Sequence, residues 1–223
     1  MGGRQQATAR VDAGDTTTGQ GDDGIVRQLY VHIPFCHHIC PYCSFYKHKP
    51  HRGALANREF VAALLSDLKQ SVAEAPDFTL QPETIYFGGG TPTLLSTPLI
   101  SELLDGIAAS LDLSALNEWT VEANPATFDL TKIRALRERG VSRVSLGVQS
   151  WSAETLEILG RDHSPAAAEA AYGILREAEI DAVNIDLMFS TPGEAADSWR
   201  GTLDRTIALQ PDHISAYNLN YEE

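Results

Sequence analysis

The chain has 223 residues, enough for one substantial domain with a buried core. Its formal net charge is −13 and it has no block of Lys or Arg that could follow a phosphate backbone, so we expect no nucleic-acid partner. The 43% of hydrophobic residues are spread along the chain, and no apolar run approaches the ~20 residues that cross a bilayer, so no integral membrane segment is expected.

The first 28 residues are polar, so residues 1–28 are predicted to form a disordered tail ahead of a folded core at 29–223. A secretory signal would need an apolar stretch that this segment lacks. An organelle transit peptide would need more basic residues than Arg4 and Arg10, and fewer acidic ones beside them. The expected location is therefore the cytoplasm.

From Leu29 onward, short apolar runs alternate with segments of helical spacing. The predicted strands are 29–34, 84–87, 119–122, 143–148, 182–188 and 213–219. Apolar residues recur at helical spacing within 60–68, 99–107, 133–136, 168–175 and 203–207. Thr97-Pro98 and Ser164-Pro165 predict helix starts, and Gly140 predicts a helix end.

This alternation predicts an α/β fold with a parallel sheet and right-handed crossovers, either a barrel or an open doubly wound sheet. The sequence stops soon after the last predicted strand, too early for a closed eight-stranded barrel. We therefore expect a partial (β/α)6 barrel that is truncated before a C-terminal domain.

All three cysteines lie within eight residues after the first predicted strand, at Cys36, Cys40 and Cys43. Clustered thiols in an odd number make a poor disulfide framework, and in a reducing cytoplasm they more often serve metal or redox chemistry. Three thiolates on one loop can hold three corners of a 4Fe–4S cluster, which usually takes four protein thiolates. One iron then keeps an open coordination position, as a catalytic metal site requires.

Other interpretations of this loop stay open. Zinc could be held by the three thiolates together with His37, His38 or His48. Cys40 and Cys43 could instead form a thiol–disulfide site, although the usual thioredoxin-like setting is missing. Three inert structural cysteines would be a coincidence at this spacing.

The Cys-x3-Cys-x2-Cys loop resembles the signature of the radical S-adenosylmethionine (SAM) superfamily. Matching motifs between Tyr30 and Tyr221 make the chain similar to the coproporphyrinogen dehydrogenase group, which contains the oxygen-independent coproporphyrinogen III oxidases and the HemW-type haem chaperones. The resemblance implies a cluster that receives an electron from a donor and passes it to SAM at the open iron. Cleavage of SAM then gives methionine and a 5′-deoxyadenosyl radical, which abstracts hydrogen from a substrate.

The resemblance also implies the residues that contact SAM, which are Tyr30, Gly89, Gly90, Thr91, Glu122, Gln149, Arg161, Asp186 and Asn220. Glycines that follow a strand let the backbone approach a ligand closely. A carboxylate at a strand end, such as Glu122, can accept hydrogen bonds from hydroxyl or ammonium groups, and a guanidinium such as that of Arg161 suits a carboxylate. Asp186 interrupts an apolar strand and needs a partner there. The resemblance is weakest at 190–193, where this chain has Ser-Thr-Pro-Gly and the family has Gly-Leu-Pro-Gly.

One position separates the two functions within the group. The oxidases carry a further cysteine two residues after the third, whereas this chain has Phe45 there, as HemW-type proteins do. The segments 159–163 and 216–219 also resemble HemW-type proteins. The resemblance therefore implies a haem chaperone that binds haem and delivers it to haem-accepting proteins. The alternatives are an oxidase that decarboxylates a porphyrinogen and a metal-binding module without catalysis.

Overall fold

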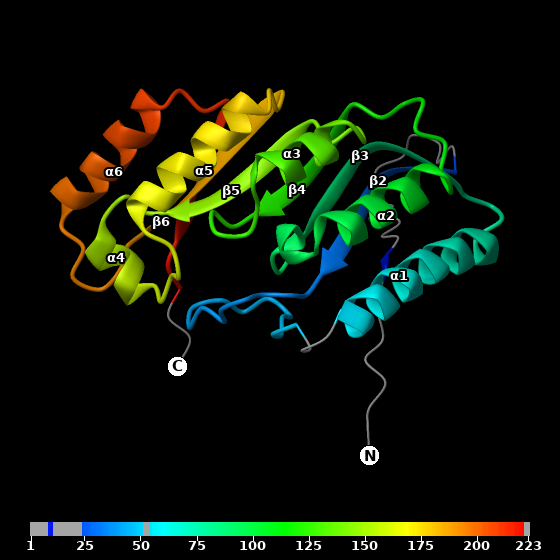
Figure 1. Cartoon of the computed structure of the whole chain (residues 1–223), viewed down its shortest axis with the longest axis horizontal. Coiled ribbons are helices and arrows are strands. Elements are labelled where there is room, and N and C mark those ends of the chain that lie inside the picture. Colours follow the sequence, from blue (N-terminus) through cyan, green and yellow to red (C-terminus); the bar gives the residue numbers. More distant parts are fainter. Residues whose placement is uncertain (1–8, 11–23, 51–53, 221–223) are drawn as a thin grey trace, which may run out of the picture.

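The computed structural model describes residues 9–10, 24–50 and 54–220 (Figure 1). Its strands form one sheet in chain order, in which β1 pairs antiparallel with β2 and every later strand runs parallel to the one before it. The strands are β1 (Ala9–Arg10), β2 (Ile25–Ile33), β3 (Thr79–Gly89), β4 (Glu118–Ala123), β5 (Arg143–Gln149), β6 (Ala182–Phe189) and β7 (His213–Asn218). The predicted partial barrel of six parallel strands is confirmed.

Helices connect the parallel strands. They are α1 (Ala54–Glu74), α2 (Thr97–Ala108), α3 (Leu130–Arg137), α4 (Ala153–Ile158), α5 (Pro165–Glu177) and α6 (Ala196–Ala208), with a 3-10 turn at Pro92–Leu94. Figure 1 shows α1, α2, α3, α5 and α6 side by side over one face of the sheet, in chain order. Each crossover therefore returns on the same side, and none of these five helices covers the other face of the sheet. Within the described residues, no helix is both long and apolar enough to cross a membrane.

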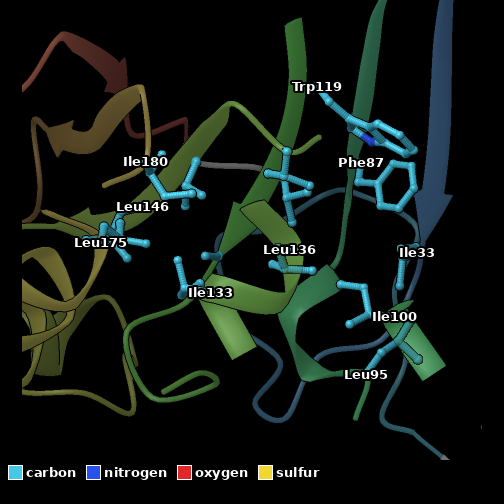
Figure 2. Close-up of a cluster of buried hydrophobic side chains, with 14 of the residues drawn as sticks. Ile33, Phe87, Leu95, Ile100, Trp119, Ile133, Leu136, Leu146, Leu175 and Ile180 are labelled. Atoms are coloured by element: carbon cyan, nitrogen blue, oxygen red, sulfur yellow. The ribbon is translucent and has the colours of Figure 1, made fainter. Parts of the chain in front are cut away.

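The hydrophobic core lies between the sheet and these helices (Figure 2). Val121, Val144 and Ile185 point from the strands into it, and each is fully buried. They meet helix residues such as Leu136 and Leu175, which are also fully buried. Burial of one such side chain stabilises the fold by about 1.5–3 kcal/mol, so this layer is the main source of stability.

The helix signals in the sequence were partly correct. Ser164 caps α5 by accepting a hydrogen bond from the Ala167 amide, and Pro165 is the first helical residue, as predicted. Gly140 follows α3 with a φ of 95°, a conformation that favours glycine. The predicted start of α2 is one residue late, because Ser96 rather than Thr97 is the N-cap. The short helix α4 was not predicted.

Two strands begin well before their predicted starts, while the other strand boundaries agree with the prediction to within two residues. Strand β2 begins at Ile25 rather than at Leu29, and β3 begins at Thr79 rather than at Thr84. Both extensions pair with each other, beyond a register shift between Val26 and Gln28. Strand β1, within the predicted tail, pairs with the middle of β2; the predictions for 1–8 and 11–23 lie outside the described residues.

The turn after β6 explains why the family motif has glycine at its start. Ser190 adopts a φ of 63°, in the left-handed region that costs a residue with a Cβ about 1 kcal/mol or more. The chain therefore makes the turn with a serine in a conformation that glycine adopts freely.

Candidate functional site at the carboxyl edge of the sheet

A cavity of about 360 Å³ lies where the parallel strands end, beneath the loop that follows β2. In Figure 1 this loop runs along the lower edge of the sheet towards α4. The cavity is lined by every residue that the sequence analysis assigned to the site except Tyr30: Cys36, Cys40, Cys43, Gly89, Gly90, Thr91, Glu122, Gln149, Arg161, Asp186 and Asn220. Strands β3 to β6 and the segment after β7 all contribute, so residues up to 184 positions apart in the chain share one space.

A wider hollow of about 650 Å³ lies elsewhere, between the ends of α3 and α5. Its charged side chains pair with one another, as in Arg134 with Glu177 at 3.8 Å and Arg137 with Glu179 at 3.5 Å. Exposed pairs of this kind form a solvated surface. The candidate functional residues therefore line the smaller cavity and not this hollow.

The cysteine loop is anchored at both ends by backbone hydrogen bonds. The Cys36 amide donates to the carbonyl of His48 at 3.0 Å, and the His48 amide donates to Pro34 at 2.9 Å. Within the loop, the Cys43 amide donates to the Cys40 carbonyl at 3.2 Å, which closes a turn between the second and third cysteines. The 13 residues from 36 to 48 thus form a closed loop over the cavity.

The three thiols suit a cluster that is bound one iron per thiolate. All three line the cavity, and each is a free thiol. Burial raises the pKa of Cys36, as do the nearby thiols of Cys43 and Cys40, while the Thr91 hydroxyl lowers it. In the part of the chain that the structure describes, no three His, Cys, Asp or Glu side chains surround a single point where one metal ion could sit. Among the zinc ligands considered, His37 pairs with Asp162 at 3.5 Å.

The glycine run after β3 packs against the start of the cysteine loop. The Gly90 amide donates to the carbonyl of Ile33 at 2.8 Å, and the Thr91 amide donates to that of Phe35 at 2.7 Å. A Cβ on Gly90 would lie 2.7–2.8 Å from the backbone of Ile33 and Phe35, closer than real Cβ contacts come. The space that glycine provides at this position is therefore filled by the chain's own backbone, so Gly90 first serves to place the cysteine loop.

Glu122, near the end of β4, is a partly buried carboxylate with two donors. The Tyr86 hydroxyl donates to its Oε1 at 2.8 Å, and the Gly89 amide also donates to it. Burial and the nearby Asp186 raise the pKa of Glu122 to about 7, and the two hydrogen bonds offset only part of this shift. Glu122 thus changes charge near neutral pH, and a cationic ligand would favour its ionised form.

Asp186, on β6, faces the same cavity and is held by hydrogen bonds from β5 and from β6 itself. The Ser145 hydroxyl donates to its Oδ2 at 2.8 Å, and the Asn184 amide donates to its Oδ1 at 2.7 Å. Burial raises the pKa of Asp186, and bonds from Ser145, Asn184 and Ser215 work against the rise. Two carboxylates in one cavity provide acceptors for hydroxyl and ammonium groups.

Arg161 connects the cysteine loop to the sheet. Its guanidinium donates to the Cys40 sulfur at 3.6 Å and to the carbonyl of Gly147 at 2.9 Å. Burial lowers the pKa of Arg161, but Tyr42 and Cys40 outweigh burial and raise it. Among the described residues, nothing accepts a hydrogen bond from its buried Nε. An orphaned donor on a buried cation suits an anionic group such as a carboxylate.

His163 steadies the loop that carries Arg161. It is buried, and its Nε2 contacts the Val148 carbonyl at 3.1 Å, so this nitrogen carries the proton. Burial and the neighbouring Arg161 lower the pKa of His163 to about 4. The imidazole is therefore neutral at physiological pH and does not repel the guanidinium.

The remaining predicted residues divide into cavity lining and support. Gln149 ends β5 with a φ of 68°, beyond a register shift that follows Gly147. Asn220 lines the cavity after β7. Tyr30 lies outside the lining: its ring stacks on that of Tyr86 with the centroids 6.1 Å apart, and burial followed by Glu122 raises its pKa to about 12. Tyr30 thus supports the tyrosine that binds Glu122.

Sequence analysis missed several lining residues, among them Tyr42, Lys47, Tyr86 and Tyr217. Alternation along β3 could have identified Tyr86, because it lies on the opposite face from the core residues Ile85 and Phe87. Lys47 donates to the carbonyls of Cys43 and Phe45 and so closes the end of the cysteine loop. Its position follows from a loop conformation that shows no periodic signal.

Comparison with known proteins gives a consistent result. A family model described as the radical SAM superfamily matches residues 30–206. The haem chaperone HemW of Escherichia coli (strain K12) is 41% identical over 194 residues, which are 87% of this chain and 50% of that protein. The oxygen-independent coproporphyrinogen III oxidase of Pseudomonas aeruginosa is 35% identical over 193 residues, 85% of this chain and 41% of that protein.

Among solved structures, the coproporphyrinogen III oxidase HemN of Escherichia coli, described as a radical SAM enzyme, superposes with a TM-score of 0.76 at 30% identity. The match covers 89% of this chain and 44% of that one. The chain spans about half the length of the curated relatives that it matches. The similarity therefore extends over nearly the whole of this chain but over only part of each relative.

Proposed function

The chain belongs to the radical SAM superfamily, and on that premise we propose that it functions as a HemW-type haem chaperone, which binds a 4Fe–4S cluster, SAM and haem and delivers haem to haem-requiring proteins. Membership in the superfamily implies the cluster and SAM. The observation that carries the proposal is the meeting of three thiols, two partly buried carboxylates and one partly buried arginine at a single cavity.

Each group at the cavity has a defined part in this proposal. Cys36, Cys40 and Cys43 would hold three irons of the cluster, which supplies an electron to the sulfonium of SAM when both are bound. Arg161, with its orphaned Nε, would bind the carboxylate of SAM. Glu122 would accept hydrogen bonds from the hydroxyl or ammonium groups of SAM. The Tyr86 hydroxyl would fix the orientation of the Glu122 carboxylate.

Haem handling rests on the relatives and on one side chain. Phe45 stands where the oxidases carry a further cysteine, and its ring is 68% exposed at the rim of the cavity. An exposed aromatic ring offers a flat apolar surface, which suits a porphyrin. The partners of the protein would be haem-accepting proteins and an electron donor, and its location would be the cytoplasm. Conversion of coproporphyrinogen is the second candidate, supported by the similarity to HemN.

Anaerobic reconstitution with iron and sulfide tests the cluster. We expect about four irons per chain in the wild type and a strong loss of iron in Cys36→Ala. The matched controls are His37→Ala and His38→Ala, which should keep their iron, because both are loop residues that a zinc site but not the cluster would use. Iron uptake that survives Cys36→Ala would contradict the proposal.

Two assays then separate the functions. Haem added to the reconstituted protein should shift its Soret band, and the protein should leave coproporphyrinogen unconverted in the presence of SAM and dithionite. Conversion without a Soret shift would favour the oxidase. The absence of both would leave only a metal-binding module.

A further inference from the structure

Asp186 belongs to a partly buried polar cluster that extends away from the cavity across three strands. We define the Asn184 cluster as Ser145 on β5, Asn184 and Asp186 on β6, and His213 and Ser215 on β7. Asn184 is fully buried and Ser145 is 3% exposed, whereas His213, at the start of β7, is exposed. The cluster thus leads from the cavity to the surface of the last strand.

Hydrogen bonds in the cluster fix the orientation of the Asn184 amide. Its Oδ1 lies 2.6 Å from Nδ1 of His213 and 3.1 Å from the Ser215 hydroxyl, which also lies within hydrogen-bond reach of Asp186. Since an amide oxygen only accepts, Nδ1 of His213 must carry a proton. With Oδ1 engaged by β7, Nδ2 faces the other way, where it donates to Asp186 Oδ1 at 2.7 Å and to Ser145 Oγ at 2.7 Å.

Ser145 completes the arrangement from the other side. Its oxygen accepts from Asn184, so its hydroxyl proton is directed to Asp186 Oδ2, 2.8 Å away. Asn184 thus donates to Oδ1 of Asp186 and Ser145 donates to Oδ2, and the carboxylate cannot rotate without losing both bonds. Such donors favour the charged form of a buried acid and set its orientation.

We propose that Asn184 is a positioning residue for the SAM site: its amide, oriented from β7 by His213 and Ser215, fixes the Asp186 carboxylate towards the cavity. This inference rests on the proposed function, in which the cavity binds SAM. The inference gives β7 a role in orienting Asp186, which the residues that line the cavity do not reveal by themselves. Asn184 and His213 act through Asp186, because neither lines the cavity.

A purely structural role would not require this polar chain. Neighbouring residues on the other face of the same strands, Val183 and Ile185, are fully buried and apolar. Buried polar groups that could be replaced by apolar ones seldom add stability over them. The polar residues of the Asn184 cluster therefore act to orient the Asp186 carboxylate.

The test is SAM binding to the reconstituted protein, measured anaerobically by equilibrium dialysis, with the iron content and the melting temperature measured in parallel. We expect Asn184→Ala to weaken SAM binding about tenfold, the effect of losing one hydrogen bond to a charged group. The control is Thr206→Val, which removes an equally buried bond, from Trp151 to α6, and should leave SAM binding unchanged.

The dependence on Asp186 is tested by a double-mutant cycle. If Asn184 acts through this carboxylate, Asn184→Ala should cause little further loss once Asp186→Ala is present. Equal SAM binding by the wild type and Asn184→Ala would overturn the inference, as would fully additive losses. Failure of the wild type itself to bind SAM would instead contradict the proposed function.

His213 provides a second route if Asn184→Ala does not fold. His213→Ala removes the donor that orients the amide from an exposed position, and we expect SAM binding about threefold weaker, in line with one neutral hydrogen bond. His213→Asn should restore it, because the side-chain nitrogen of asparagine can take the place of Nδ1. Unchanged binding in His213→Ala, or loss without rescue by asparagine, would overturn the inference.

Discussion

The two faces of the sheet are built from alternate residues of the same strands, yet they have opposite chemistry. On the helix-covered face, Val144, Leu146 and Ile185 are apolar and fully buried. On the other face, Ser145 and Asp186, their direct neighbours in the chain, are polar and hydrogen-bonded to one another. The period of two along a strand places these sets on opposite sides.

This difference assigns stability to one face and function to the other. The apolar face buries side chains that each stabilise the fold by about 1.5–3 kcal/mol. The polar face keeps two carboxylates out of water, which is unfavourable unless they are hydrogen-bonded or paired. The polar side chains of this face form hydrogen bonds with one another and converge on the cavity. Ligand binding therefore explains why polar residues occupy this face of the sheet.

The largest effect on stability is expected on the apolar face. Leu146→Ala should lower the free energy of unfolding by about 2–5 kcal/mol, because the surrounding core cannot collapse fully around the lost side chain. Urea denaturation followed by circular dichroism measures the change. Leu146→Met, which keeps the volume, is the control and should cost less than about 1.5 kcal/mol. A loss as small for alanine as for methionine would mean that this face does not dominate stability.

An intermediate effect, with an unusual dependence on pH, is expected at Glu122. The folded chain raises its pKa from 4.5 to about 7. Between these values the folded state keeps a proton that the unfolded state has released, so stability falls as pH rises from about 4.5 to 7 and stays lower above it. Glu122→Gln removes this penalty and keeps an acceptor for the Tyr86 hydroxyl.

In the absence of SAM, the free energy of unfolding of Glu122→Gln should therefore exceed that of the wild type by ~1–3 kcal/mol at pH 8. This difference should vanish near pH 4.5. Urea denaturation at several pH values measures this difference. Glu118→Gln, at the other end of the same strand, is the matched control and should show no such gain. Equal free energies of unfolding of the wild type and Glu122→Gln at pH 8 would show that ionisation of Glu122 does not destabilise the folded state, and would contradict a raised pKa.

The sequence was most informative where strand periodicity and motif chemistry agree. Gly89, Glu122 and Gln149 were predicted at or just after the ends of three parallel strands, and the carboxyl edge of a parallel sheet brings such residues to one place. The structure does place them around one cavity. This prediction rested on the position of these residues at or after strand ends and on the resemblance to the family.

What the sequence did not reveal depends on loop conformation and on contacts between strands. The packing of Gly90 against Ile33 and Phe35 and the contact of Arg161 with the Cys40 sulfur both depend on how the cysteine loop closes. The partners of Asn184 lie 29 and 39 residues away, on β7 and β5. Only the strand register brings them together, and no local pattern encodes it.

The smallest effect, and the sharpest comparison with Leu146, is expected at the adjacent Ser145. Ser145→Ala removes one donor from Asp186 and one acceptor from Asn184, without creating an apolar cavity. We expect the free energy of unfolding to fall by only about 0.5–1.5 kcal/mol, as for a typical buried hydrogen bond. The pKa of Asp186 should rise further, because a donor to its charged form is lost. Urea denaturation of Ser145→Ala beside Leu146→Ala compares the two faces at neighbouring positions. If the serine variant lost as much stability as the leucine variant, the polar face would be part of the folding core, and its chemistry could not be attributed to ligand binding alone.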